Sequence, residues 1–409
     1  MKNNLINECV FYTALWCLYY LQGTLYPSGG IISQSVLLVI QMLSIYYTFI
    51  SFVKYNPPTF LKAVAVFLGM FVVYFLISHL DPTPIYTDFT MEKQVTAFGP
   101  LKGVSMSLLP IYAYYHFGRK GLLTRQNIPQ YLFCFLVLTT IVFTREQNIN
   151  ISLAMSVGSK QEEFTNNVAY EFLQLFPLLV FLNKKPMIQY MALIYIMSFI
   201  LLGMKRGAIL IGIICTLYFI YQSCKSASRK QRIRIVALTI VALVVFSYFA
   251  IDFMTSSDYL QSRLEATMEG NTSGRNYIYS TLFEHMLSRE TIGTILFGEG
   301  INHTVVIAGN YAHNDWLELG INMGFMGILV YICYFVALGA HALYAQRYDK
   351  DIYISLTLCI IITFASTLFS MSYNSLTTAF TMGLGWCLAN YNNIKRTTDE
   401  NLYNNTRLS

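Results

Sequence analysis

The chain has 409 residues, of which 55% are hydrophobic and only 12% are charged, and its mean hydropathy is +0.48. A soluble domain carries about 25% charged residues, so this composition excludes an ordinary soluble protein and predicts an all-α, polytopic integral membrane protein. The net charge of +6 does not indicate nucleic-acid binding, because the basic residues are distributed by membrane side rather than gathered on one folded domain.

We predict one integral membrane domain, 1–409, with about twelve apolar segments long enough to cross a bilayer. The break between the two segments within 187–222 is very short, so their boundaries stay open. In chain order the predicted segments are 8–24, 31–53, 60–80, 101–117, 128–144, 166–183, 187–204, 206–222, 234–253, 314–344, 352–371 and 374–392.

The loops between these segments set the orientation. Two thirds of the 27 Lys and Arg residues fall on the side that holds the N-terminus. Because basic loops stay in the cytoplasm, both ends of the chain are predicted to be cytoplasmic. Three longer loops then face outward, and the largest is predicted to carry short helices at 258–268 and 275–288. These loops are 81–100, 145–165 and 254–312.

The eight cysteines indicate neither a disulfide framework nor a metal site. None belongs to a CxxC pair and none lies in a long polar loop, so we expect small apolar fillers within helices. We therefore predict no metal and no cofactor.

His313 lies where a polar loop meets an apolar helix, on the outer side. If the helix is continuous, Gly320, Gly324 and Gly327 lie within about 40° of His313 on a helical wheel. Such a stripe predicts close approach of a second helix, and Glu318 falls on another face. An imidazole suits general-base catalysis near neutral pH, so His313 is the catalytic candidate. The alternative is a polar cap at the membrane interface.

Arg275 and Arg206 are the candidate anion-binding residues. Arg275 begins a predicted helix, where a cation opposes the helix dipole unless an anion lies between them. Arg206 lies beside Lys205 in the short outer break, where basic residues are disfavoured. Arg275 could instead be a solvated arginine, and Arg206 could instead be an anchor that snorkels to the interface. Together with His313, the two arginines suit a pyrophosphate leaving group and a hydroxyl nucleophile.

Glu171 is the acidic residue deepest in a predicted span. An ionisable residue there is a functional hypothesis by default, although a snorkelling carboxylate near the outer end explains it equally well. Glu171 joins Lys205, Ser273 and Asn314 as a candidate supporting residue.

The chain resembles the O-antigen ligase and polymerase superfamily, which consists of bacterial membrane enzymes that handle undecaprenyl-linked glycans. The resemblance covers roughly residues 190–345 and departs at Lys205, where the family more usually has a small residue. It implies a metal-independent glycosyltransferase. The matching stretches are Lys205-Arg206-Gly207, Ser273-Gly274-Arg275, Phe297-Gly298-Glu299-Gly300, and Ala312-His313-Asn314 followed by Gly324 and Gly327.

The resemblance further implies a donor glycan on undecaprenyl pyrophosphate and a site on the periplasmic face of the inner membrane. The acceptor would be another lipid-linked repeat unit for a polymerase, a lipid A core sugar for a ligase, or a protein hydroxyl. Membrane lipids, a chain-length regulator and a flippase are further implied partners.

We favour polymerisation of O-antigen or capsule repeat units, because no extended outer domain for binding a protein is predicted. A polysaccharide flippase or other transporter is the alternative of another class. Transporters carry polar interruptions at the bilayer midplane, whereas here the polar candidates gather at the outer mouth, which favours an enzyme.

Overall fold

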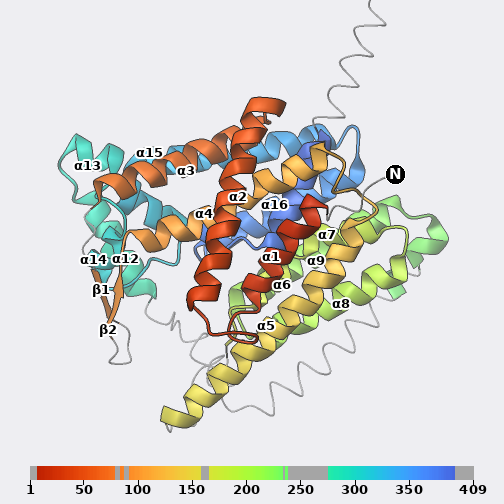
Figure 1. Ribbon diagram of the computed structural model, residues 1–409, viewed down its shortest axis with the longest axis horizontal. Helices are drawn as coiled ribbons and strands as arrows, with labels where there is room; N and C mark the ends of the chain where they lie inside the picture. The colour runs from red at the N-terminus through yellow and green to blue at the C-terminus, as the bar shows by residue number, and fades with distance from the viewer. Residues whose placement is uncertain are drawn as a thin grey trace, which may run out of the picture.

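The computed structural model describes residues 7–78, 83–86, 92–157, 165–233, 235–237 and 275–391. Helices dominate these residues, and two short strands pair as an antiparallel hairpin (Figure 1). In chain order the elements are α1 (Glu8–Tyr20), α2 (Ile31–Tyr55), α3 (Thr59–Ile77), β1 (Thr83–Tyr86), β2 (Glu92–Val95), α4 (Phe98–Arg119), α5 (Ile128–Val157), α6 (Ala169–Leu173), α7 (Phe176–Leu179), the 3₁₀ turn η1 (Val180–Leu182), α8 (Pro186–Leu202), α9 (Arg206–Ser226), α12 (Arg275–Leu287), α13 (Ile292–Phe297), α14 (His303–Ala308), α15 (Asp315–Ala345), α16 (Lys350–Ser366), the 3₁₀ turn η2 (Ser372–Asn374) and a last helix over 378–391.

The predicted membrane class is confirmed by five described helices that are long and apolar enough to cross a bilayer, namely α2, α3, α5, α9 and α15. Shorter apolar helices occupy Ala169–Leu182 and Pro186–Leu202. Each predicted span contains helix within the described residues, although only 235–237 of the span 234–253 are described. The number of spans therefore stays a prediction.

The predicted span 166–183 is not one helix. It is divided into α6, α7 and η1, with a turn at Gln174 and Leu175. Pro177 has no backbone N–H, so it cannot donate the hydrogen bond that would continue α6. It lies in the first turn of α7, where that N–H is not needed. Every side chain from Phe172 to Leu182 is buried, so this broken segment runs through the protein interior.

The predicted outer loop 145–165 is also partly helical, because α5 continues to Val157. Residues 145–157 contain no glycine or proline, the residues that commonly stop a helix. The polar side chains of these residues end the apolar segment, but the backbone remains helical to Val157. The loop 81–100 carries the β1–β2 hairpin, in which Thr83 pairs with Val95.

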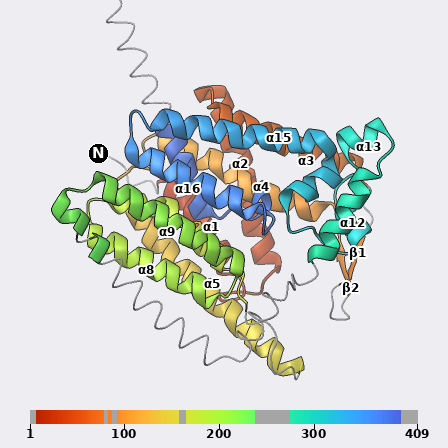
Figure 2. The ribbon, with the colours of Figure 1, turned by 180° about the vertical axis from the view of Figure 1, so that it is seen from behind.

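The short helix predicted at 275–288 is α12. Leu282 on α12 is fully buried with Ala312 and Ile321, and Ile278 and Met286 pack against this cluster. Its apolar face therefore covers the start of α15, as its sequence pattern predicted. The helix predicted at 258–268 lies outside the described residues. The segments α12–α14 and the β1–β2 hairpin gather at one end of the molecule, at the left in Figure 1 and at the right in Figure 2.

The helix α15 breaks at Gly324, where φ is 61° and ψ is −158°. The predicted stripe through Gly320, Gly324 and Gly327 is therefore wrong, because it required a continuous helix. Gly324 instead meets the loop after α13, and a Cβ added to it would lie 2.5 Å from the backbone nitrogen of Gly298. The close approach that the glycines allow is between this loop and the helix break.

The loop supplies the hydrogen bonds that the break removes. The backbone N–H of Glu299 donates to the carbonyl of Ile321 at 3.0 Å, and that of Gly300 donates to the carbonyl of Asn322 at 2.9 Å. In an unbroken helix these carbonyls would accept from residues four positions later. The break is therefore part of the fold, because buried carbonyls need such partners.

We expect Gly324→Ala to lower the Tm of the purified protein in detergent. A side chain there clashes with backbone atoms and adopts a left-handed φ, a strain of about 1–3 kcal/mol before the clash is counted. Gly339→Ala on the same helix is the matched control, since nothing lies within 4 Å of its added Cβ. Alanine within a helix is favoured over glycine by about 0.5–1 kcal/mol, so this control should keep or raise the Tm. Equal Tm values for the two variants would contradict the role of the break.

Candidate functional site

His313 lies immediately before α15 in an unusual backbone conformation. Its φ is 50°, in the left-handed region that few residues other than glycine adopt. Asn314 follows as the N-cap, and its side-chain oxygen accepts from the N–H groups of Trp316 at 3.0 Å and Leu317 at 3.2 Å. The residue predicted as supporting thus caps the helix, and the imidazole of His313 takes no part in that cap.

The loop before His313 is fixed by Glu318. This carboxylate is 1% exposed and accepts from the Ala312 N–H at 2.9 Å, from the Thr304 hydroxyl at 2.6 Å and from the Asn322 amide at 3.0 Å. Glu318 therefore ties α14 and the residue preceding His313 to the first turns of α15. Its oxygens have their own partners, which agrees with the prediction that Glu318 points away from His313.

Asp315 is also buried and hydrogen-bonded. Its carboxylate accepts from the Tyr331 hydroxyl at 2.6 Å and from the Ser372 N–H at 3.0 Å, and its own N–H donates to the carbonyl of Thr367 at 2.9 Å. These bonds attach the start of α15 to the segment after α16.

That same segment contacts the start of α9. A Cβ added to Gly207 would lie 3.0 Å from the Cβ of Phe369 and would meet the hydroxyl of Tyr170. Arg206, the first residue of α9, and Lys205, its N-cap, are thereby brought to the side of the protein that carries His313. Sequence reasoning missed Tyr170, because nothing in its local pattern marks it.

The electrostatics of His313 show which predicted residues come together. Burial lowers the pKa of His313, and the positive charges of Arg275 and Lys205 lower it further. The imidazole is therefore neutral near neutral pH and able to accept a proton. Arg275 also lies within electrostatic reach of the Tyr170 hydroxyl. Lys205 and Arg275 thus lie within electrostatic reach of His313, while Ser273 lies outside the described residues.

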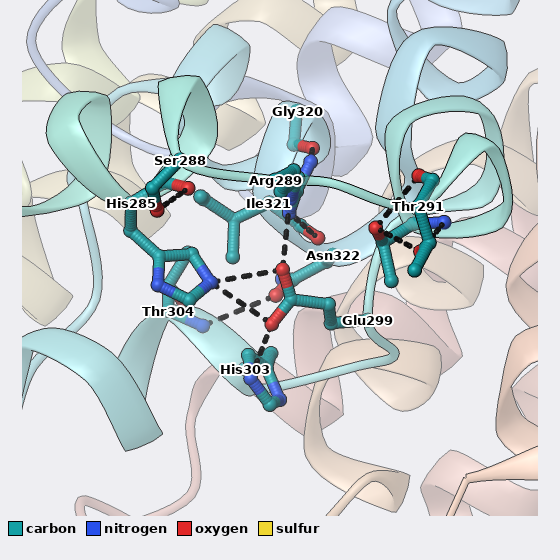
Figure 3. A network of polar contacts seen from close by, with 11 residues as sticks. His285, Ser288, Arg289, Thr291, Glu299, His303, Thr304, Gly320, Ile321 and Asn322 are labelled. Carbon is teal, nitrogen blue, oxygen red and sulfur yellow. Dashed lines mark hydrogen bonds and ion pairs between the residues drawn. The ribbon is translucent and has the colours of Figure 1, made fainter.

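A second polar cluster forms around Glu299 (Figure 3). The carboxylate accepts from Arg289 at 2.8 Å and from His285 at 2.9 Å, and His303 lies 2.6 Å from its other oxygen. The two terminal nitrogens of Arg289 donate to the carbonyls of Gly320 and Ile321, each at 2.8 Å. This cluster connects α12 and α14 to the break in α15.

Residues 191–332 match the family model described as O-antigen ligase. This region is similar to the O-antigen ligase and polymerase superfamily. No curated protein matches the chain. The O-antigen ligase region includes Lys205, Arg206, Arg275, Glu299 and His313, so the base candidate, the cations around it and the carboxylate of the second cluster share one family region.

His285, Glu299 and His303 in the O-antigen ligase region also have the residue types of a metal site. Their ligand atoms all lie within 4.8 Å of one another, and imidazole and carboxylate suit divalent transition metals. Arg289 already neutralises the carboxylate, and its charge opposes a cation. Sequence reasoning missed this cluster. Glu299 and His303 are four residues apart, but His285 comes from another helix, and no sequence pattern shows that it lies beside them. The absence of a metal site stays a prediction.

Glu171 lies outside the O-antigen ligase region. It is half-buried on α6 and lines a polar cavity with residues from the end of α1 and from α5.

We expect Glu299→Gln to lower the Tm at neutral pH. Arg289, whose side chain is 5% exposed, would lose its carboxylate, at a cost of roughly 1–3 kcal/mol. Burial raises the pKa of Glu299, but hydrogen bonds from His285 and Arg289 outweigh burial and leave the pKa below its usual value of 4.5. The ion pairs therefore stabilise the fold fully above that usual value, and their contribution is lost as pH falls through the lowered one.

The Tm difference between wild type and Glu299→Gln should accordingly shrink only under strongly acidic conditions. Glu290→Gln is the control, since Glu290 is a neighbouring exposed glutamate. A Glu299→Gln protein as stable as this control at pH 7 would show that the cluster does not hold the α15 break.

Proposed function

We propose that this protein is a membrane glycosyltransferase that transfers a glycan from undecaprenyl pyrophosphate to a sugar hydroxyl. A membrane protein with an O-antigen ligase domain acts in the processing of lipid-linked glycans. One observation carries the finer proposal: His313 is half-buried just before α15, and its pKa is lowered by burial and by the charges of Arg275 and Lys205. A proton acceptor beside fixed cations suits a reaction in which a hydroxyl attacks and an anion leaves.

In the proposed reaction, the acceptor hydroxyl oxygen attacks the anomeric carbon of the donor sugar. A new glycosidic C–O bond forms, and the bond from that carbon to the pyrophosphate oxygen breaks. The pyrophosphate leaves with the electron pair and is held by Arg206 and Arg275, whose guanidinium groups match phosphate oxygens. The hydroxyl proton passes to His313. The buried bonds of Glu318 and the cap at Asn314 keep His313 in position.

We place this site on the periplasmic face of the bacterial inner membrane, with both ends of the chain in the cytoplasm. The β1–β2 hairpin and α14 belong to two loops predicted to share the outer side, and they lie beside each other in the fold. Their proximity supports that common side, because loops on opposite faces would be separated by the bilayer.

Polymerisation of repeat units is our preferred reaction, and ligation to the lipid A core is the alternative. The described outer segments comprise only the hairpin and short helices, which favours a lipid-linked acceptor over a protein. Glycan profiling of a deletion strain separates the reactions. Loss of a polymerase leaves single repeat units, loss of a ligase leaves finished chains on the carrier lipid, and loss of a flippase leaves lipid-linked units on the cytoplasmic side.

We expect Arg275→Lys to fail nearly as badly as Arg275→Ala in glycan transfer from purified lipid-linked donor in proteoliposomes. A lysine keeps the charge but not the two-pronged geometry that matches phosphate. Arg347→Lys is the matched control, since Arg347 is exposed beyond the far end of α15. Both Arg275 variants should accumulate in membranes as the wild type does. Near-normal transfer by Arg275→Lys would exclude bidentate recognition.

We expect Lys205→Gln to move the acidic limb of the kcat/KM profile to higher pH. The charge of Lys205 lowers the pKa of His313, so its removal raises that pKa, and the base becomes protonated at a higher pH. His313→Gln should lower the rate about 10²–10⁴-fold and abolish this limb. A limb that stays in place in Lys205→Gln, or persists in His313→Gln, would mean that another group is the base.

A further inference from the structure

The polar cavity beside α6 has a chemistry distinct from that of the cationic region around His313. It measures about 320 Å³ and lies between the end of α1, the outer half of α5 and the start of α6. Pockets for small ligands begin at about 300 Å³, so the space suits a compact ligand. Residues that line it and matter here are Tyr20, Arg145, Glu146, Asn150, Asn167 and Glu171.

The charged residues of the cavity argue against an anionic ligand. Arg145 is paired with Glu146 at 2.6 Å, so its charge is already neutralised. Glu171 adds a carboxyl group, so the described residues lining the cavity offer a phosphate no unpaired positive charge. Side-chain amides and carboxylates instead offer the mixture of donors and acceptors that a neutral ring with several hydroxyls requires.

Part of this polar lining has no partner within the described protein. The side chains of Asn167 and Glu171 make no hydrogen bond or ion pair to any described residue. Asn150 uses its amide nitrogen on the carbonyl of Thr165 at 3.3 Å, which leaves its side-chain oxygen for a ligand. Tyr20 adds an aromatic wall, with its ring 5.8 Å from that of Trp16.

The cavity adjoins the break that carries Lys205 and Arg206. Asn166, another lining residue, donates its backbone N–H to the carbonyl of Gly203 at 2.8 Å. On α6, Glu171 lines the cavity, while the preceding residue, Tyr170, reaches Gly207 with its hydroxyl. A ligand in the cavity would therefore lie next to the proposed pyrophosphate site.

We propose that this cavity binds a neutral sugar ring of the glycan substrate beside the pyrophosphate site. The inference rests on the proposed glycosyltransferase function and extends it. The cationic region takes the charged phosphates, and the cavity takes the hydroxyl-rich ring. The ring could belong to the donor or to the acceptor glycan, since both carry the same chemistry.

The test uses the full-length protein in nanodiscs and the free oligosaccharide released from its lipid-linked donor by mild acid. Saturation-transfer NMR should detect binding of this oligosaccharide to the wild type. Glu171→Gln replaces a carboxyl oxygen with an amide nitrogen, and Asn167→Trp fills the cavity from an exposed position. Both variants should weaken binding about tenfold, the expected effect of losing one hydrogen bond to the sugar. Glu284→Gln, at an exposed glutamate on α12, is the control and should bind normally.

Transfer kinetics identify the source of the ring. A raised KM for the lipid-linked donor alone assigns the cavity to the donor sugar, and a raised KM for the acceptor alone assigns it to the acceptor. In either case the acidic limb of the pH profile should stay in place, since His313 is not altered.

Unchanged binding in both variants, or no binding by the wild type, would overturn the sugar site. Failure of the proposed function gives a different pattern, in which the wild type binds the oligosaccharide but transfers no glycan. Arg275→Ala should lose transfer and keep oligosaccharide binding, because it does not line the cavity.

Discussion

A helix that breaks within a folded membrane protein leaves backbone carbonyls without intrahelical partners, and α15 breaks at Gly324. The side chain of Arg289 donates hydrogen bonds to the carbonyls of Gly320 and Ile321. The backbone N–H groups of Glu299 and Gly300 donate to the carbonyls of Ile321 and Asn322. The outer-side helices α12 and α14 join this arrangement through His285 and His303. Unsatisfied carbonyls in an apolar surrounding cost several kcal/mol, so this requirement fixes the outer segments against the membrane helices.

The position of His313 follows from the same arrangement. Glu318, about two turns before the break, accepts from Ala312 and from Thr304 of α14. The residue before His313 and the helix beside it are thus held by one buried carboxylate. A left-handed φ at His313 carries strain that must be met by such surrounding bonds. The strain and the rigid support are consistent with a catalytic imidazole, since preorganised groups need no rearrangement during reaction.

Under the proposed function, the site would divide its substrate by charge. Lys205, Arg206 and Arg275 offer positive charge to a pyrophosphate, whereas the neighbouring cavity pairs its one arginine internally and presents carboxylates and amides. The short helix α6 contributes to both, with Tyr170 toward Gly207 and Glu171 in the cavity. Because α6 is a single turn ended before Pro177, adjacent residues can serve the two regions without a long helix between them.

Several features could be predicted because they depend on local sequence. The membrane class follows from composition, and α12 follows from the spacing of Ile278, Leu282 and Met286, which indeed pack on the start of α15. The predicted site of Arg206, Arg275 and His313 rested on membrane sidedness and stays a prediction, although the charges of Arg275 and Lys205 do reach His313. The end of α5 was predicted too early, because the polar residues after 144 were taken to end the helix. The segment 166–183 was predicted as one helix, because its apolar residues were taken to continue the helix through Pro177.

Sequence by itself thus determined the class of the protein and most of its helices, and it supplied the site residues that stay a prediction. Tertiary structure alone decided the break at Gly324, the cluster around Glu299 and the cavity that contains Glu171. The physical reason is that these features depend on contacts through space. The break is defined by Gly298 touching Gly324, and the cavity by α1 meeting α5 and α6 more than 100 residues along the chain. The pattern of residues within one segment does not show which distant segment it will contact.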